Sequence, residues 1–402
     1  MIEQGSMHAK PEERPNIALS SLGETLTESD YGIEAGVLSL IESEKGIPTE
    51  VTRDLSLRAK IIDSCGLTCT FCHNEGTPVA IDNPSGVIAI RGIGGKSSRS
   101  SVFSATNMVN FLPGRMEATD PDFIRALSSL RGELGLNELH LTGGEPTLHP
   151  SISNLVHAAR EQGYKVSMTS NGESGSKRIR ELAEAGLRKI NFSIFGTTAE
   201  ELAEVQSDKF IQRKGLAEKK IDALHESIKL AGDNGIKIAA NIVMGGPEHA
   251  QRIERVIDEF DPRLEIRILP DLSVGLESAV SIYSFLDRRE AKPIIRQVEA
   301  GSSNTRVKYA LPNGRVIVFK QIRPTRLNEC DGCKFNNPDD CKEGFYGIRL
   351  YVDNLGNYLV GICLQRMDLT TSVNDFLSSD LKDQVLGLRS SEYEAMKKIH
   401  TV

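Results

Sequence analysis

The chain has 402 residues, of which 39% are apolar and 26% are charged, and its formal net charge is −7. We expect a globular protein with one large domain and a smaller one. Because lysines are scattered among carboxylates and form no broad basic face, a duplex nucleic acid is not an expected partner. No apolar run approaches the ~20 residues of a membrane span and no signal-like start is present, so the sequence predicts a cytoplasmic protein without a membrane partner.

Residues 1–55 are predicted to form an N-terminal extension, in which the short apolar stretch 37–41 could be a helix. From residue 58 onward, short β-branched runs alternate with amphipathic segments, which is typical of βαβ units around a parallel sheet. Strands are expected at 59–63, 138–141, 165–169, 189–194, 237–243 and 264–268. Six units are too few for a closed eight-unit barrel. The predicted fold class is therefore α/β, an open (β/α)6 partial barrel over residues 56–290 whose sites lie at the C-terminal ends of its strands.

Helix signals separate these strands. Asp120 followed by Pro121 predicts a capped helix start, and the helix then carries Phe123, Ala126, Leu127 and Leu130 on one face. Helix ends are expected at Gly163, Gly186 and Gly235. The long stretch 73–115 is rich in Gly and Ser and suggests a lid or insertion. We expect a small C-terminal domain at 291–375 and a helical tail at 376–402.

Cys65, Cys69 and Cys72 follow the first predicted strand with C-x3-C-x2-C spacing. In a reducing compartment, clustered cysteines are better explained by metal than by disulfides. Three thiolates bind three irons of a [4Fe–4S] cluster and leave the fourth iron open, where S-adenosylmethionine (SAM) can chelate through its amino and carboxylate groups. The alternatives are a zinc site and buried structural thiols.

This spacing, in the loop after the first strand, resembles the defining motif of the radical SAM superfamily. Phe71, directly before the third cysteine, matches the aromatic residue usual there. The resemblance implies that an electron, from a donor such as flavodoxin or ferredoxin, cleaves SAM reductively. The resulting 5′-deoxyadenosyl radical then removes a hydrogen atom from the substrate.

Three further segments resemble SAM-binding elements of this superfamily. Gly143, Gly144 and Glu145, followed by proline, match its GGEP element, where backbone and carboxylate meet the SAM amino group. An ordinary Gly-Pro turn is the alternative. The resemblance also implies contacts to the ribose and methionine parts of SAM from Ser170, Asn171 and Ser193. A common turn and a packed strand serine are the simpler interpretations of these residues.

Three other features carry less weight. Arg267, near the end of the sixth strand, could bind an anionic group, with a structural ion pair as the alternative. The run that begins at Gly92 looks like a phosphate loop, but Ile90 stands where the Walker spacing needs its first glycine. His73 belongs to no paired metal spacing and is interpreted as a loop residue.

The remaining cysteines, Cys330, Cys333, Cys341 and Cys363, form a second group of four. They could hold an auxiliary [4Fe–4S] cluster or a structural zinc, and a third alternative is that they bind no metal. If all four ligate an auxiliary cluster, electron transfer or structural support becomes its expected role. The spacing leaves open whether Cys341 or Cys363 is a non-ligand.

The segment 347–356, together with Cys363 and Leu364, resembles the C-terminal cluster region of the GTP 3′,8-cyclases of molybdenum-cofactor synthesis. Those cyclases have three auxiliary cysteines and a glycine-rich tail, whereas this chain has four and ends in a Lys/Glu-rich helix. The resemblance implies a nucleotide or nucleoside substrate in which a carbon–carbon bond forms. Candidate anion partners are Lys320, Arg323, Arg326 and Arg349, with a solvated basic face as the alternative. A peptide-modifying radical SAM maturase and a metal-holding binding protein are the competing hypotheses.

Overall fold

The computed structural model describes residues 34–77, 115–323, 325–337, 340–353 and 355–400. Most of the expected insertion at 73–115, including the run from Gly92, lies outside the described residues. Within the described ranges, no helix is both long and apolar enough to cross a membrane.

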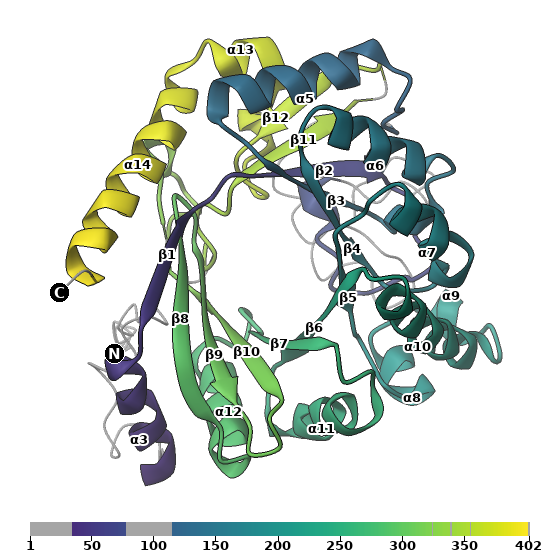
Figure 1. The fold of residues 1–402 in the computed structure, drawn as a ribbon, viewed down its shortest axis with the longest axis vertical. Coiled ribbons are helices and arrows are strands. Elements are labelled where there is room, and N and C mark those ends of the chain that lie inside the picture. Colours follow the sequence, from purple (N-terminus) through teal and green to yellow (C-terminus); the bar gives the residue numbers. More distant parts are fainter. Residues whose placement is uncertain (1–33, 78–114, 324, 338–339, 354, 401–402) are drawn as a thin grey trace, which may run out of the picture.

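In the described ranges, one sheet of thirteen strands forms the body of the molecule, in the order β1-β8-β9-β10-β7-β6-β5-β4-β3-β2-β11-β12-β13. Its centre is the six parallel strands β2 (Ser56–Ile62), β3 (Glu138–Gly143), β4 (Lys165–Ser170), β5 (Lys189–Ser193), β6 (Lys237–Met244) and β7 (Glu265–Pro270). These confirm the six expected strands, with ends shifted by a few residues. Figure 1 shows the sheet curving into an open ring with helices outside it, which is the predicted partial barrel.

Both edges of this barrel sheet are extended by strands from elsewhere in the chain. Next to β7 lie β10 (Val316–Ile322, parallel), β9 (Asn304–Ala310), β8 (Lys292–Ala300) and β1 (Thr49–Arg53). Next to β2 lie β11 (Ile348–Val352, parallel), β12 (Tyr358–Gly361) and β13 (Thr371–Ser372). The region expected as a C-terminal domain thus continues the barrel sheet on both sides. The proposed domain boundaries stay predictions.

The connections between the parallel strands contain helices that cover the outside of the sheet. They are α5 (Pro121–Leu134), α6 (Ile152–Glu161), α7 (Gly175–Glu184), α8 (Ala199–Glu204), α9 (Asp208–Ile211), α10 (Leu216–Asp233) and α11 (Ala250–Glu259), with α12 (Leu276–Arg288) after β7. The expected caps are present: the Asp120 side chain accepts the Asp122 N–H, and Gly163, Gly186 and Gly235 all have positive φ. α13 (Val373–Leu377) begins before the predicted tail at 376–402, and α14 (Asp380–His400) lies within it.

Short 3-10 turns complete the described elements. They are η2 (Glu44–Gly46), η3 (Asn74–Gly76), η5 (Pro146–Leu148), η6 (Pro247–His249), η7 (Asn328–Cys330) and η8 (Met367–Leu369).

The helix expected at 37–41 is confirmed as α3 (Ala35–Ser43), and the turn after it is tied into the barrel. The buried Glu44 carboxylate accepts bonds from Tyr283 (3.0 Å) and Tyr309 and pairs with Arg296 at 2.9 Å. Gln321 donates to the same carboxylate at 3.2 Å. The described part of the predicted extension is therefore part of the fold.

The two faces of the central strands differ in polarity. Leu57, Ala59 and Ile61 on β2 are fully buried on the helix-covered face. The alternate positions point inward, and strand register aligns Arg349, Arg58, His140, Ser167 and Lys189 in one row across β11, β2, β3, β4 and β5. The outer face thus supplies the hydrophobic core, and the inner face carries polar and charged side chains.

Candidate active site

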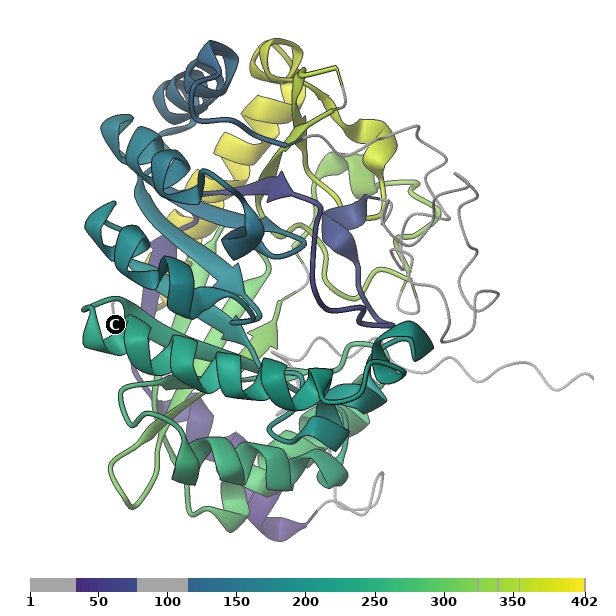
Figure 2. The ribbon, with the colours of Figure 1, turned by 90° about the vertical axis from the view of Figure 1, so that its right-hand side faces the viewer.

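The three expected cluster cysteines lie together in the loop after β2. Cys65, Cys69 and Cys72 pack in one small apolar cluster with Leu67, Leu202 and Phe210. Backbone pairing joins Cys69 to Gln206, between α8 and α9, and the Thr70 N–H donates to the Val205 carbonyl at 3.0 Å. In Figure 2 this loop descends from the barrel toward α9. The chain between α8 and α9 therefore holds the thiol loop in place.

The surroundings of the thiols suit an iron–sulfur cluster. The Gln206 side-chain amide donates to the Cys69 sulfur at 3.3 Å, and the Asn171 amide donates to the Cys65 sulfur at 3.5 Å. Such donors stabilise the charge of metal-bound thiolates. Burial, followed by the nearby Glu173 and Glu145 carboxylates, raises the pKa of the free Cys65 thiol. Among the described residues, no three His, Cys, Asp or Glu side chains already stand in a metal-binding arrangement, so the thiols share a location and not a preset coordination geometry.

Glycines allow the loops around the thiols to approach each other. A Cβ at Gly143 would collide with the Ile62 carbonyl, and one at Gly144 would collide with the carbonyls of Asp63 and Ser64. Gly143 also has φ +149°, which a side chain would strain. The glycines of the predicted GGEP element therefore let the β3 loop lie directly against the backbone that leads into Cys65.

Glu145 is only 1% exposed and links the β3 and β4 loops. One carboxylate oxygen accepts bonds from Thr147 N (3.0 Å), Thr147 Oγ1 (2.6 Å) and Ser170 Oγ (2.7 Å), and the other accepts from Asn171 N at 2.6 Å. Burial raises the pKa of this carboxyl group, while these donors oppose the shift. Glu145, Ser170 and Asn171, which the sequence assigned separately to SAM contacts, thus form one connected unit.

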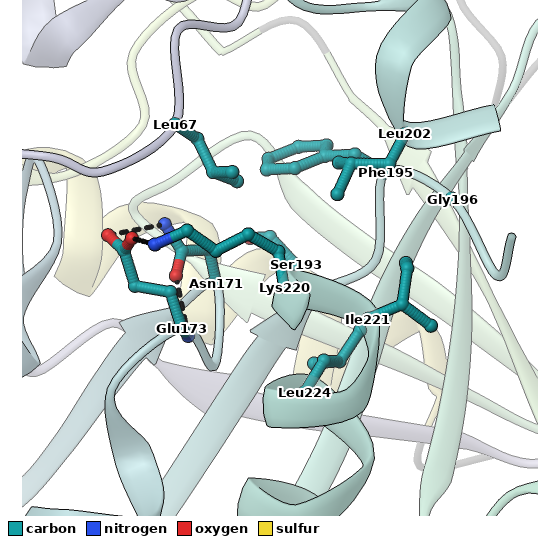
Figure 3. Close-up of a pocket in the computed structure, with 10 residues that line it drawn as sticks. All are labelled: Leu67, Asn171, Glu173, Ser193, Phe195, Gly196, Leu202, Lys220, Ile221 and Leu224. Carbon is teal, nitrogen blue, oxygen red and sulfur yellow. Dashed lines mark hydrogen bonds and ion pairs between the residues drawn. The ribbon is translucent and has the colours of Figure 1, made fainter. Parts of the chain in front are cut away.

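A pocket opens beside the thiol loop at the C-terminal ends of β4 and β5 (Figure 3). Asn171 and Ser193, both expected to contact SAM, line it together with Leu67 of the thiol loop. The other lining residues are Glu173, Phe195, Gly196, Leu202, Lys220, Ile221 and Leu224.

Two charged residues of this pocket were not identified from the sequence. Glu173 accepts the Gly66 N–H at 2.7 Å and forms an ion pair with Lys220 of α10. Glu173 directly follows the Ser-Asn-Gly segment, and this position was the sequence signal that could have identified it as a site residue. No sequence signal could have identified Lys220, because lysines on helices normally point into solvent.

Phe71 lies at the edge of the same region. Its ring is 46% exposed and meets the Phe195 ring edge-on, with centroids 5.3 Å apart. Phe195 lines the pocket, so Phe71 supports the pocket wall through another aromatic side chain.

The expected anion-binding arginines of the inner face have partners within the protein. Arg267 bonds to Glu265 (2.7 Å) and to the Asn191 amide oxygen (3.1 Å). Arg349 is 4% exposed and bonds to Glu75 at 3.2 Å. Both residues are therefore held by structural contacts, which for Arg267 was the alternative named from the sequence.

Even so, among the residues that the structure describes, cationic side chains outnumber carboxylates on the inner face. Strand register and ion pairs place two groups of side chains on this face. The carboxylates are Glu75, Glu265 and Glu299, and the cations are Arg58, Lys189, Arg267, Arg306, Lys308, Lys320 and Arg349. This excess of positive charge favours an anionic ligand on the inner face.

The other basic residues expected to bind an anion, near the C-terminal region, make different contacts. Arg323 makes two 2.8 Å bonds to Glu392 and so anchors α14, and Arg326 donates to the Cys341 carbonyl at 2.8 Å. Lys320 lies over the Tyr346 ring, 4.4 Å from its centroid. Of these residues, Lys320 faces the interior of the barrel.

The second cysteine group is gathered by the loops around η7 and β12. Burial raises the pKa of Cys330, and the Cys341 and Cys333 thiols add to the shift. Cys341 likewise contributes to the raised pKa of Cys363 after burial. Arg366 reaches the Cys333 sulfur at 3.6 Å. All four cysteines therefore lie within electrostatic reach of at least one other member of the group.

Comparison with known proteins points to one family. The model of the radical SAM superfamily matches residues 60–260. The probable GTP 3′,8-cyclase of Saccharolobus solfataricus is 26% identical over 82% of this chain and 91% of its own length. The probable GTP 3′,8-cyclase of Metallosphaera sedula is 26% identical over 80% of this chain and 84% of its own length.

Solved structures were compared as well. The structure of Streptococcus suis SuiB bound to S-adenosylmethionine is 15% identical, with a TM-score of 0.44, over 86% of this chain and 68% of that chain. Methylornithine synthase is 15% identical, with a TM-score of 0.39, over 67% of this chain and 74% of that chain.

Proposed function

Because the chain belongs to the radical SAM superfamily, we propose that it cleaves SAM reductively at a [4Fe–4S] cluster held by Cys65, Cys69 and Cys72. Once bound, the cluster would supply the electron and the open iron that this chemistry requires. The observation that carries the proposal is that the three thiols lie together in one loop, beside residues Asn171 and Ser193. Flavodoxin or ferredoxin is the proposed class of electron donor.

SAM would bind against the lining of the pocket beside the thiol loop, since this pocket is too small to hold the whole molecule. Asn171 and Ser193 offer polar groups to the ribose and methionine parts, while Leu67 and Phe195 offer apolar surface. The backbone at Gly143 and Gly144 would lie along the methionine end, and Glu145 would position it by holding the β3 and β4 loops together. These contacts orient SAM and exclude water from the radical.

We propose an anionic nucleotide or nucleoside derivative as the substrate, bound on the inner face of the barrel. The excess of cationic over acidic side chains on that face supports an anion there. Lys308 lies on the same face as Arg267, since both pair in register with Val318 of β10. The relatives are probable GTP 3′,8-cyclases, which supports a cyclase that forms a carbon–carbon bond within such a substrate.

We further propose that Cys330, Cys333, Cys341 and Cys363 hold a second [4Fe–4S] cluster. Their mutual electrostatic influence supports a shared site. With four thiolates available, this cluster would need no ligand from the substrate. Electron transfer or structural support is then its role.

The test is anaerobic cluster reconstitution followed by mass spectrometry of 5′-deoxyadenosine, with SAM, a strong reductant and a panel of nucleotides. Two matched variants are compared with wild type. In the first variant, Cys65, Cys69 and Cys72 are replaced by alanine; in the second, the four C-terminal cysteines are replaced by alanine. We expect 5′-deoxyadenosine from wild type, none from the first variant, and a rise with one nucleotide. Failure of any nucleotide to raise its formation would reject the substrate class, and its absence from cluster-loaded wild type would reject the enzyme.

A further inference from the structure

We infer that Gln206 is a positioning residue that raises the reduction potential of the proposed SAM-cleaving cluster through its bond to Cys69. Gln206 is fully buried, at 0% exposure. Its amide nitrogen lies 3.3 Å from the Cys69 sulfur, and its amide oxygen accepts the Thr68 N–H at 2.6 Å. The second bond fixes the orientation of the amide, because the oxygen must face the Thr68 donor and the NH2 group must then face the sulfur.

Hydrogen bonds also hold the backbone around the Gln206 amide. Cys69 and Gln206 form a β-bridge, and the Ser207 N–H donates to the Thr68 carbonyl at 3.2 Å. Phe210 and Leu202 close the site on the α8–α9 side. The donor is therefore built in place before any cluster is inserted.

The expected rise in reduction potential follows from the charge that the cluster gains on reduction. Reduction adds one negative charge to a cluster and its thiolates, so a hydrogen bond to a ligand sulfur stabilises the reduced form more than the oxidised form. An N–H aimed at Cys69 thus makes the cluster easier to reduce. Asn171 is a weaker case, since its bond to Cys65 is 3.5 Å long and its NH2 group also meets Glu173 at 3.2 Å.

This inference rests on the proposed function and can be tested separately from it. Two variants remove the donor: Gln206→Leu, which is apolar, and Gln206→Glu, which keeps an oxygen for the Thr68 N–H. The matched control is Gln321→Leu, which removes another buried glutamine that bonds to Glu44 and Tyr283. The readouts are iron and sulfide content and the midpoint potential from an EPR-monitored redox titration, with the cluster signal identified by its change on SAM addition.

We expect both Gln206 variants to load the cluster and to shift its midpoint to more negative potential, further with the carboxylate, while the Gln321 control keeps the wild-type value. An unchanged midpoint in both loaded variants overturns the inference. Loss of the cluster from Gln206→Glu also overturns it, because the residue would then hold the loop and not tune the cluster. A wild-type protein that never loads the cluster would instead reject the proposed function, and this inference with it.

Discussion

Arg349 on β11 and Glu75, three residues beyond Cys72, form a buried ion pair with 3.2 Å between Nε and Oε2. They are 274 residues apart in the chain. Arg58 approaches the other Glu75 oxygen at 3.5 Å, and the Tyr351 hydroxyl donates to the Glu75 carbonyl at 2.8 Å. The strand that the C-terminal region adds to the barrel thus holds the segment that follows the thiol loop.

Replacing Glu75 with glutamine should strongly destabilise the fold, by about 3–5 kcal/mol, because it leaves Arg349 charged and buried without its partner. The measurement is urea unfolding of the metal-free protein. The control is Glu42→Gln, which removes an exposed pair with Lys45 and should cost less than about 1 kcal/mol. Equal costs for the two variants would contradict the assigned role.

The same pair predicts a pH dependence. Burial alone would raise the pKa of Glu75, but Arg58 and Arg349 hold it well below its usual range. Because the folded pKa is depressed, the stabilisation is present above the unfolded value of about 4.3 and is lost as the pH falls toward the folded value. Wild type should therefore lose more stability on acidification than Glu75→Gln, as unfolding at a series of pH values can show.

Gly144→Ala should abolish SAM binding, because the new Cβ would meet the carbonyls of Asp63 and Ser64 and push the β3 loop away from the thiol loop. Equilibrium dialysis with labelled SAM measures this. Gly132→Ala is the control: it lies within α5 with no atom near the added Cβ, and should stabilise the helix by up to about 1 kcal/mol. Normal SAM affinity in Gly144→Ala would show that the close approach is not needed.

His140 should stay neutral at the pH of the assay. Its ring nitrogens lie 2.8 Å from Ser167 Oγ and 2.7 Å from Thr169 Oγ1, and burial, then the Arg58 charge, lowers its pKa to about 3. The unfolded chain takes up this proton more readily, so the free energy of unfolding should fall as the pH drops from about 6.5. His140→Gln should show a shallower dependence in that range, and an unchanged slope would refute the assignment.

Lys308→Met should raise the KM for an anionic substrate by about tenfold or more, because one charge-assisted hydrogen bond to the substrate is lost. Lys308 faces the inside of the barrel, and SAM cleavage without substrate should continue. The control is Lys229→Met, which removes an exposed lysine paired with Asp233 on α10. Steady-state kinetics compare the two, and an unchanged KM in Lys308→Met would place the anion elsewhere.

The sequence alone predicted the six central strands, the caps of their helices and the thiol motif. These features are local, because a short β-branched run, an Asp-Pro helix start, a glycine helix end and a cysteine spacing each involve only a few neighbouring residues. The resemblance to the radical SAM superfamily implied that Gly143, Gly144, Asn171 and Ser193 contact SAM, and these contacts stay predictions.

Other features were decided only by the tertiary structure. The additions β10 and β11, parallel to β7 and β2, follow no βα rhythm, so no local pattern predicted that they extend the barrel. The amide of Gln206, the ion pair of Lys220 with Glu173 and the partners of Arg349 and Arg267 join segments distant in sequence. The type of a side chain indicates what it can bind, but only the packing of distant segments decides which partner lies within bonding distance. For this reason the sequence determined the barrel and, through the family resemblance, the class of chemistry, and the tertiary structure determined which charged side chains already have partners within the protein.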